Sequence, residues 1–262
     1  MSELLAQAQH WLLALVLSVP RVLALFAVLP FLTRQVLPPT LRNGVAIVLA
    51  LVAVPGVHAA LPGHALDFPA VLLLIGKELL LGGLAGYLVA LLFWAVAAAG
   101  FFLDSQRGAM SATLFTPLVG SETSPLGAFL TQVLVTLLFV SGGFLALLDA
   151  LYTSYLSWPV LSWWPRLDPQ GALFFLQQLD GLMRVMLLIA GPAVILMLLA
   201  ELGMALIGRF VPQINVFLLA MPVKSALALL FLALYMGAIV RWADGAFADV
   251  GGLVRRLGQF LP

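Results

Sequence analysis

Long apolar runs dominate this chain and restrict what it can fold into. A helix needs about 20 apolar residues to cross the hydrocarbon core of a bilayer. Six runs approach or exceed this length, at residues 11–31, 41–57, 68–103, 126–148, 182–207 and 216–240. The pattern predicts an all-α membrane protein with about six long apolar helices, although the run at 68–103 is too long for one simple span.

Composition excludes several other classes of protein. Hydrophobic residues make up 63% of the 262 residues and charged residues only 9%, whereas soluble globular chains carry about 25% charged residues. A net charge of +1 gives no electrostatic basis for binding nucleic acid. The chain has no cysteine, which excludes disulfides, thiolate metal sites and thiol catalysis. A cleavable signal peptide is not expected, because Glu3 stands where a basic region would be and Arg21 interrupts the first apolar run. We therefore expect this run to remain in the mature protein.

No motif of an enzyme or of a metal site is recognisable. His10, His58 and His64 do not form HExxH, and no two of them stand at helical ligand spacing. The sequence also lacks a GxSxG elbow, a Walker A loop and a GxGxxG turn. We therefore expect a non-enzymatic protein without catalytic residues, cofactor or metal ion.

Seven charged residues lie within or beside the apolar runs, although a charge at the centre of a bilayer helix costs about 2.5–3.5 kcal/mol. They are Arg21, Lys77, Glu78, Asp180, Arg184, Glu201 and Lys224. Asp180 and Arg184 share a helix face and can pair, whereas the adjacent Lys77 and Glu78 are expected to need separate partners. Two interpretations remain open: the charges satisfy one another between packed helices, or they line a proton or ion path.

Three other segments differ from the apolar runs in composition. Residues 104–125 are polar and rich in small side chains, residues 149–170 are rich in aromatic residues and proline, and residues 241–262 form a tail that contains two arginines. We interpret the second segment as an interfacial aromatic belt and the third as a short amphipathic helix at the membrane surface. Gly82 and Gly86 stand four residues apart in an apolar run, which predicts close packing of helix backbones.

The stretch at residues 201–225 carries polar residues where a bilayer helix normally excludes them. Its two apolar parts are separated by a break with Arg209, Pro212, Gln213 and Asn215, and the second part contains Pro222 and Lys224. The pattern indicates either a helical hairpin with its tip at the break, or charges that face protein or water. Both interpretations fit a part of a helical assembly better than a simple membrane anchor.

The same region resembles the C-terminal signature of a known family. GRFVPQINVFLLAMPVKS at residues 208–225 is similar to the T subunit of the bacterial type III secretion export apparatus (SctT), whose flagellar counterpart is FliR. The MPVKS ending favours the injectisome branch. RVLALFAVLPFL from Arg21, the segment at 34–42, Lys77-Glu78 with the two following glycines, and the segment at 100–125 also look like parts of this family. The resemblance covers most of the chain.

The resemblance implies an architecture and a set of partners. A P-subunit-like helical part, residues 1–180, would be fused to a Q-subunit-like helical hairpin with an amphipathic tail, residues 181–262. One such chain would join five P-like (SctR or FliP) and four Q-like (SctS or FliQ) subunits, with a U-type switch protein (SctU or FlhB) as a further partner. Unfolded secreted proteins would pass through this assembly in the bacterial inner membrane, and the complex can sit raised toward the periplasm.

The resemblance also places the segment at 104–125 inside the channel as a plug. The plug residues that we single out are Gln106, Arg107, Gly108, Met110, Ser111, Phe115, Pro117 and Gly120. Non-helical backbone survives at membrane depth only inside protein or beside water, and small side chains would let such a loop pack and then move aside. Gly108, Gly120 and Gly127 are candidate hinges. The alternative is an ordinary surface loop between two helices.

In the hairpin interpretation, the polar tip is the place to probe for contacts at the cytoplasmic mouth, and Lys224 has a role as well. We expect Lys224 to pair with a carboxylate across a subunit interface or to line the cytoplasmic entrance. An alternative function is an ion- or proton-coupled secondary transporter that uses Arg21, Lys77, Glu78 and Arg184 as a relay, but the sequence shows no repeated pair of halves. An intramembrane hydrolase lacks any catalytic pattern.

Overall fold

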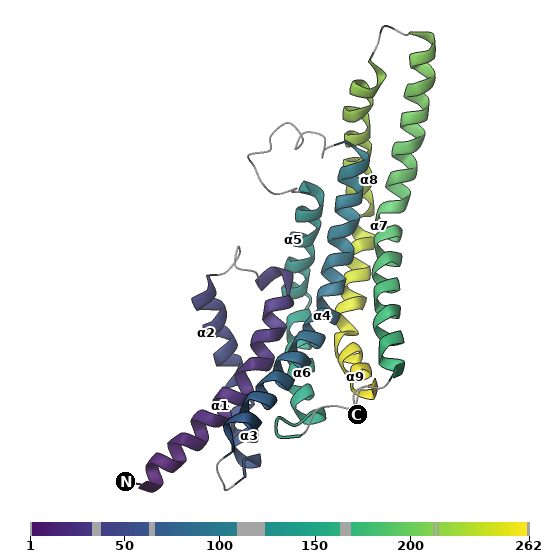
Figure 1. The fold of residues 1–262 in the computed structure, drawn as a ribbon. Coiled ribbons are helices and arrows are strands. Elements are labelled where there is room, and N and C mark those ends of the chain that lie inside the picture. Colours follow the sequence, from purple (N-terminus) through teal and green to yellow (C-terminus); the bar gives the residue numbers. More distant parts are fainter. Residues whose placement is uncertain are drawn as a thin grey trace. The chain divides into compact units, whose positions relative to one another are not determined.

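The computed structural model of the chain describes residues 2–32, 38–62, 66–108, 124–162, 169–211, 213 and 215–260. These residues form α-helices and one short 3-10 helix, with no strand among them (Figure 1). In chain order the elements are α1 (Ser2–Val28), η1 (Pro30–Leu32), α2 (Pro39–Ala50), α3 (Val54–Ala60), α4 (Phe68–Gln106), α5 (Pro125–Val140), α6 (Gly143–Ser157), α7 (Pro169–Phe210), α8 (Val216–Ala248) and α9 (Val250–Phe260). The predicted all-α class is confirmed.

Several of these helices are suited to a membrane. Four described helices are long and apolar enough to cross one, and up to six segments qualify if the broken pairs α2–α3 and α5–α6 each form one span. The expected number of about six therefore holds only with these pairs included. The run at 68–103, expected to be too long for one simple span, lies within a single helix of 39 residues. The run at 126–148 is divided at Gly142, whose φ of 81° ends the helical path.

The chain divides into two compact units. Unit 1 contains Met1–Leu91, Gly142–Leu176 and Phe247–Pro262, and unit 2 contains Leu92–Ser141 and Gln177–Ala246. The expected division at residues 180 and 181 rests on family likeness rather than on packing, and it stays a prediction.

Close contact of α1 with α4 organises unit 1. A Cβ atom at Gly82 would overlap the backbone carbonyl of Arg21, and one at Gly86 would lie 2.8 Å from the Leu25 carbonyl oxygen. Glycine is therefore required at both positions for the two backbones to approach, and the predicted close packing is confirmed. A small apolar core beside this contact is formed by Ala14, Leu17, Val54, Val57 and Val160.

Unit 2 contains a second glycine contact and a helical hairpin. Gly100 of α4 meets the backbone of Gly127 in α5, which a Cβ atom at Gly100 would overlap, and a Cβ atom at Gly127 would lie 2.8 Å from Ser124 Oγ and 3.0 Å from the Ala97 carbonyl oxygen. Gly127 is therefore a packing residue of a helix rather than a hinge. α7 and α8 form the expected hairpin, with the break at residues 211–215.

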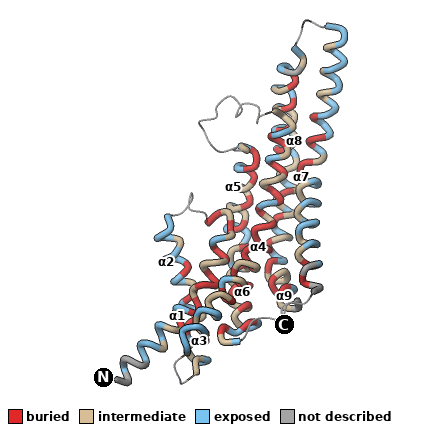
Figure 2. Tube along the Cα trace, in the orientation of Figure 1, coloured by how far each residue is buried: buried red, intermediate tan, exposed pale blue. Residues whose placement is uncertain are grey.

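Burial differs strongly between these helices. Figure 2 shows buried residues along α4, whereas α7 is exposed over most of its length. The most apolar part of α4 is 61% buried within the chain, and that of α7 is only 28% buried. Because the exposed side chains of α7 are mainly leucine, isoleucine and methionine, this helix presents an apolar surface to lipid or to other subunits.

Candidate functional site

A buried cluster of charges lies in unit 1 between α1 and α4. The Arg21 guanidinium donates two hydrogen bonds to the Glu78 carboxylate, from Nε to Oε2 at 2.7 Å and from Nη2 to Oε1 at 2.9 Å. Their side chains are 1% and 0% exposed. Bidentate pairing of this kind is the strongest geometry available to arginine and a carboxylate.

The remaining donors of Arg21 point at α6 and the residues that follow it. Nη1 donates to the Ser154 hydroxyl at 3.1 Å, and Nη2 donates to the Trp158 carbonyl at 2.8 Å. The guanidinium carbon lies 4.2 Å from the centre of the Tyr155 ring, a cation–π contact. Arg21 therefore joins α1, α4 and α6 at one buried point.

Lys77 binds backbone carbonyls of the segment that follows α6. Its ammonium donates to the carbonyls of Pro159, Val160 and Ser162 at 2.8, 2.7 and 3.1 Å. It also lies 3.2 Å from Glu78 Oε1. Lys77 and Glu78 thus have the separate partners expected of them, but the two side chains also meet, because the long lysine stem can turn toward its neighbour.

Three aromatic residues assigned by sequence to an interfacial belt belong to this packed region. Tyr152 donates to the Leu49 carbonyl at 3.2 Å, and Tyr155 donates to the Ser18 carbonyl at 2.6 Å. Trp158 is 7% exposed. For these residues the belt interpretation is wrong, because the two tyrosine hydroxyls bind backbone carbonyls inside unit 1 and Trp158 is buried there. Trp163 and Trp164 lie outside the described residues.

A second polar cluster joins the two ends of the candidate plug segment in unit 2. The Asp104 carboxylate, which is fully buried, accepts hydrogen bonds from Arg107 Nε at 2.7 Å, Ser124 Oγ at 2.6 Å and the Leu126 backbone N–H at 2.9 Å. Ser124 Oγ in turn accepts from the Gly127 N–H at 2.9 Å, which caps α5. We call Asp104, Arg107, Ser124 and Leu126 the loop stem.

The sequence interpretation did not single out Asp104 or Ser124 as functional residues. Ser124 followed by Pro125 is a helix-start signal, since serine is a favoured N-cap and proline a favoured first helical residue. This signal could have located the α5 end of the stem. Asp104 contacts Ser124 and Leu126, which are 20 and 22 positions away in sequence. Contacts between such distant residues have no local signature.

Only part of the predicted plug lies within the described residues. Gln106 ends α4, and Gly108 adopts a left-handed φ of 78° in the turn that follows. A Cβ atom at Gly108 would lie 3.2 Å from the Met221 side chain of α8. Met110, Ser111, Phe115, Pro117 and Gly120 lie outside the described residues.

The hairpin tip is exposed to its surroundings at Arg209, Gln213 and Asn215. The Asn215 side chain accepts a hydrogen bond of 3.4 Å from the Leu218 N–H at the start of α8. Pro222 lies inside α8 and is exposed, and Pro212 lies outside the described residues. Asn215 thus has a local structural role as the helix cap.

Lys224 finds its carboxylate within the same chain. Its ammonium lies 3.1 Å from Glu201 Oε2, across the α7–α8 hairpin, with the Glu201 side chain 44% exposed. The antiparallel arrangement thus brings together two residues 23 positions apart, and the expectation that Lys224 meets a subunit interface or lines the cytoplasmic entrance stays a prediction.

Asp180 and Arg184 do not form the expected pair. Both side chains are exposed on α7, and neither takes part in an ion pair within the described part of the chain. Exposed pairs at this spacing stabilise a helix by only about 0.3–0.5 kcal/mol, so little stability is lost without the pair.

The C-terminal tail is amphipathic, as expected, but its apolar side packs on protein. Val250, Val254 and Leu257 of α9 are buried, whereas Arg255 and Arg256 are exposed. A Cβ atom at Gly258 would lie 3.6 Å from the Trp158 ring, so α9 covers the end of α6 in unit 1. A membrane surface is not needed to explain the apolar face of this helix.

These features define a polytopic, all-helical membrane protein held together by buried charges. No group of three or more metal-binding side chains occurs among the residues that the structure describes. The family described as "Bacterial export proteins, family 1" matches residues 12–250. The chain belongs to this family, which confirms the resemblance found in its sequence.

Several curated proteins are similar to the chain over nearly its whole length. "Yop proteins translocation protein T" of Yersinia pestis is 46% identical over 91% of both chains. "Secretion system apparatus protein SsaT" of Salmonella typhimurium is 35% identical over 86% of this chain and 88% of its own. "Flagellar biosynthetic protein FliR" of Bacillus subtilis is 29% identical over 84% of each. Identity is higher to the two translocation and secretion proteins than to the flagellar one, and none of these names is that of an enzyme.

Proposed function

We propose that the chain is the single T subunit of a type III protein export gate in the bacterial inner membrane. It would assemble with P-like and Q-like subunits, contact the U-type switch protein and help form the channel for unfolded substrates. The family membership and the names of the similar proteins support a role in export. The largely exposed apolar surface of α7 supports assembly with other membrane subunits.

The loop stem carries the proposed gating role. A buried aspartate bound by an arginine, a hydroxyl and a backbone N–H fixes where residues 109–123 leave α4 and return to α5. Charge-assisted hydrogen bonds are about twice as strong as neutral ones, so the loop stem holds the end of α4 and the start of α5 together. We infer that the segment between its two ends closes the channel of the assembled complex.

The buried charges of unit 1 fit this role better than a relay for protons or ions. Each of Arg21, Lys77 and Glu78 has bonded partners, and all three are at most 1% exposed. Arg184, the fourth residue of the alternative relay, lies on α7 in the other unit and is exposed. The cluster thus serves to hold helices together, and the exposed tip residues Arg209, Gln213 and Asn215 are proposed to face the cytoplasmic mouth.

Deletion of residues 107–122 tests the gating role. We expect the assembled complex with this deletion to conduct ions across a planar bilayer, because the segment held by the stem would no longer fill the channel. Asp104→Ala should raise the conductance less, since the segment remains but loses its anchor. Asp180→Ala is the matched control, because Asp180 is exposed and has no described ion-pair partner. An intact deleted complex with unchanged conductance would remove the gating role.

A further inference from the structure

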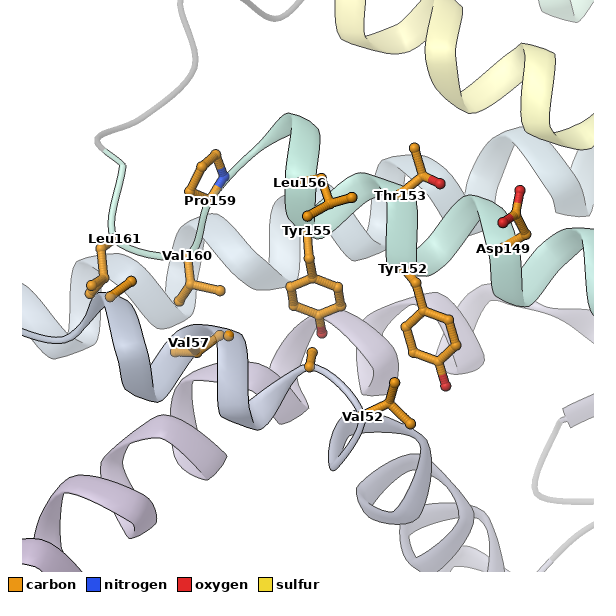
Figure 3. Close-up of a pocket in the computed structure, with 13 residues that line it drawn as sticks. Val52, Val57, Asp149, Tyr152, Thr153, Tyr155, Leu156, Pro159, Val160 and Leu161 are labelled. Atoms are coloured by element: carbon orange, nitrogen blue, oxygen red, sulfur yellow. The ribbon is translucent and has the colours of Figure 1, made fainter.

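Part of unit 1 has a groove that its own residues do not fill. A cavity of about 570 Å³ lies between the α2–α3 break and α6. Val52, Val57 and Leu156 contribute apolar walls, and the Tyr152 and Tyr155 rings reach across from α6 toward α2 and α3 (Figure 3). The Tyr152 hydroxyl donates to the Leu49 carbonyl at 3.2 Å, which joins α6 to α2 beside the groove.

The exposed face of α6 beside this groove has the spacing of a helix–helix seam. Leu145, Asp149, Tyr152 and Leu156 follow one another at intervals of four, three and four residues. Leu145 and Leu156 are 70% and 82% exposed. Such spacing aligns side chains along one side of a helix and lets a second helix pack at a shallow angle. We call these four residues the α6 stripe.

α2 also presents exposed apolar residues next to the groove. Leu41, Val45 and Val48 are separated by four and three residues and are 58%, 47% and 62% exposed, and Val52, which is 64% exposed, follows in the break after α2. The last of them, Val52, lines the same cavity as Asp149, Tyr152 and Leu156. Two apolar helical faces therefore lead to one groove, which is the arrangement that receives an amphipathic or apolar helix.

Asp149 is the one charged residue of the α6 stripe. Its side chain is exposed, and within the described part of the chain no hydrogen bond or ion pair joins its carboxylate. Arg255 of α9 lines a small neighbouring cavity with Asp149, but its Nε donates to the Gly251 carbonyl at 3.2 Å instead. Ionisable side chains within the apolar parts of membrane proteins usually pair with an opposite charge. We therefore expect a cationic partner for Asp149, which lies among leucine, valine and tyrosine.

We propose that this groove and the α6 stripe receive a helix of another membrane subunit, which carries a lysine or arginine that pairs with Asp149. The inference rests on the proposed assembly of the chain with other membrane subunits, and it adds where one of them docks and by which chemistry. The apolar seam would supply contact area, and the single charge would fix the register of the two helices.

The test uses the full chain, co-expressed with its P-like and Q-like partner subunits, with p-benzoyl-phenylalanine in place of Leu156. Because Leu156 lies about two helical turns from Asp149, illumination should link this position to a partner helix that has a lysine or arginine about two turns from the adduct. Asp149→Lys should lower recovery of the complex about tenfold or more, because like charges across a contact cost several kcal/mol. Exchanging the mapped cation for aspartate should restore recovery.

Two matched variants show whether the effect belongs to this surface. Asp180→Lys makes the same charge change at an exposed position of α7 and should leave recovery unchanged. Arg255→Ala should also leave it unchanged, and a loss equal to that of Asp149→Lys would assign Asp149 to α9 and overturn the proposal. Adducts only with lipid, with a second copy of this chain, or with a helix that lacks such a cation would also overturn it. If the parent chain forms no complex at all, the proposed function fails and the docking surface with it.

Discussion

Glu78→Ala is expected to prevent accumulation of the folded chain or to lower its free energy of unfolding by about 3–5 kcal/mol, the usual cost of breaking a buried ion pair. Among the described residues, Glu78 is the only carboxylate bonded to both Arg21 and Lys77, and its side chain is fully buried. Its removal leaves two cations in an apolar interior without their counter-charge. The contacts of Arg21 with α6 and of Lys77 with the following segment would be weakened together.

Thermal unfolding of the purified chain in mild detergent measures this effect. Asp249→Ala is the control, because it removes a carboxylate from an ion pair with Arg256 in which both side chains are about half exposed. An exposed pair contributes about 0.2–1 kcal/mol, so this variant should unfold close to the parent temperature. Equal losses for the two variants would show that the unit 1 cluster does not stabilise the fold.

Gly82→Ala is expected to destabilise the contact of α1 with α4 by about 1–3 kcal/mol, the usual cost of forcing extra volume into a packed interior. The added Cβ would overlap the Arg21 carbonyl, and a backbone atom cannot turn aside as a side chain can. Separation of the two helices would also lengthen the hydrogen bonds between Arg21 and Glu78. A methyl group at this position therefore weakens both the apolar and the charged contacts.

The neighbouring glycine provides a control that differs by one position. No atom lies within 4 Å of a Cβ built at Gly83, so Gly83→Ala meets open space. Alanine favours a helix over glycine by about 0.5–1 kcal/mol, and this variant should be as stable as the parent or slightly more so. Thermal unfolding of both variants under one set of conditions decides the matter: a stable Gly82→Ala chain would contradict the close approach of α1 and α4.

The sequence was a good guide wherever hydropathy or short spacing determined the outcome. Apolar runs near the bilayer thickness predicted helices, and the four-residue spacing of Gly82 and Gly86 predicted the contact with α1. The break at residues 211–215 predicted the hairpin, because proline and polar side chains interrupt an apolar pattern there. These features depend on neighbours along the chain.

The remaining features depend on contacts between distant residues. Arg21 and Glu78 are 57 positions apart, so the sequence showed two charges that needed partners but not that they meet. Hydropathy also did not locate the break at Gly142, because apolar residues flank it on both sides, although Ser141-Gly142-Gly143 is a local turn signal. The groove beside Asp149 exists only after α2, α3 and α6 are placed together, which explains why the sequence interpretation passed over that residue.

Membership of an export gate is tested most directly by the subunit composition of the complex that contains this chain. The full chain should be co-expressed with its small P-like and Q-like partners, extracted in mild detergent and weighed intact by native mass spectrometry. The proposed function predicts one complex that holds a single copy of this chain with five P-like and four Q-like subunits. Recovery of the chain only as a free monomer, or as several copies in one particle, would contradict it.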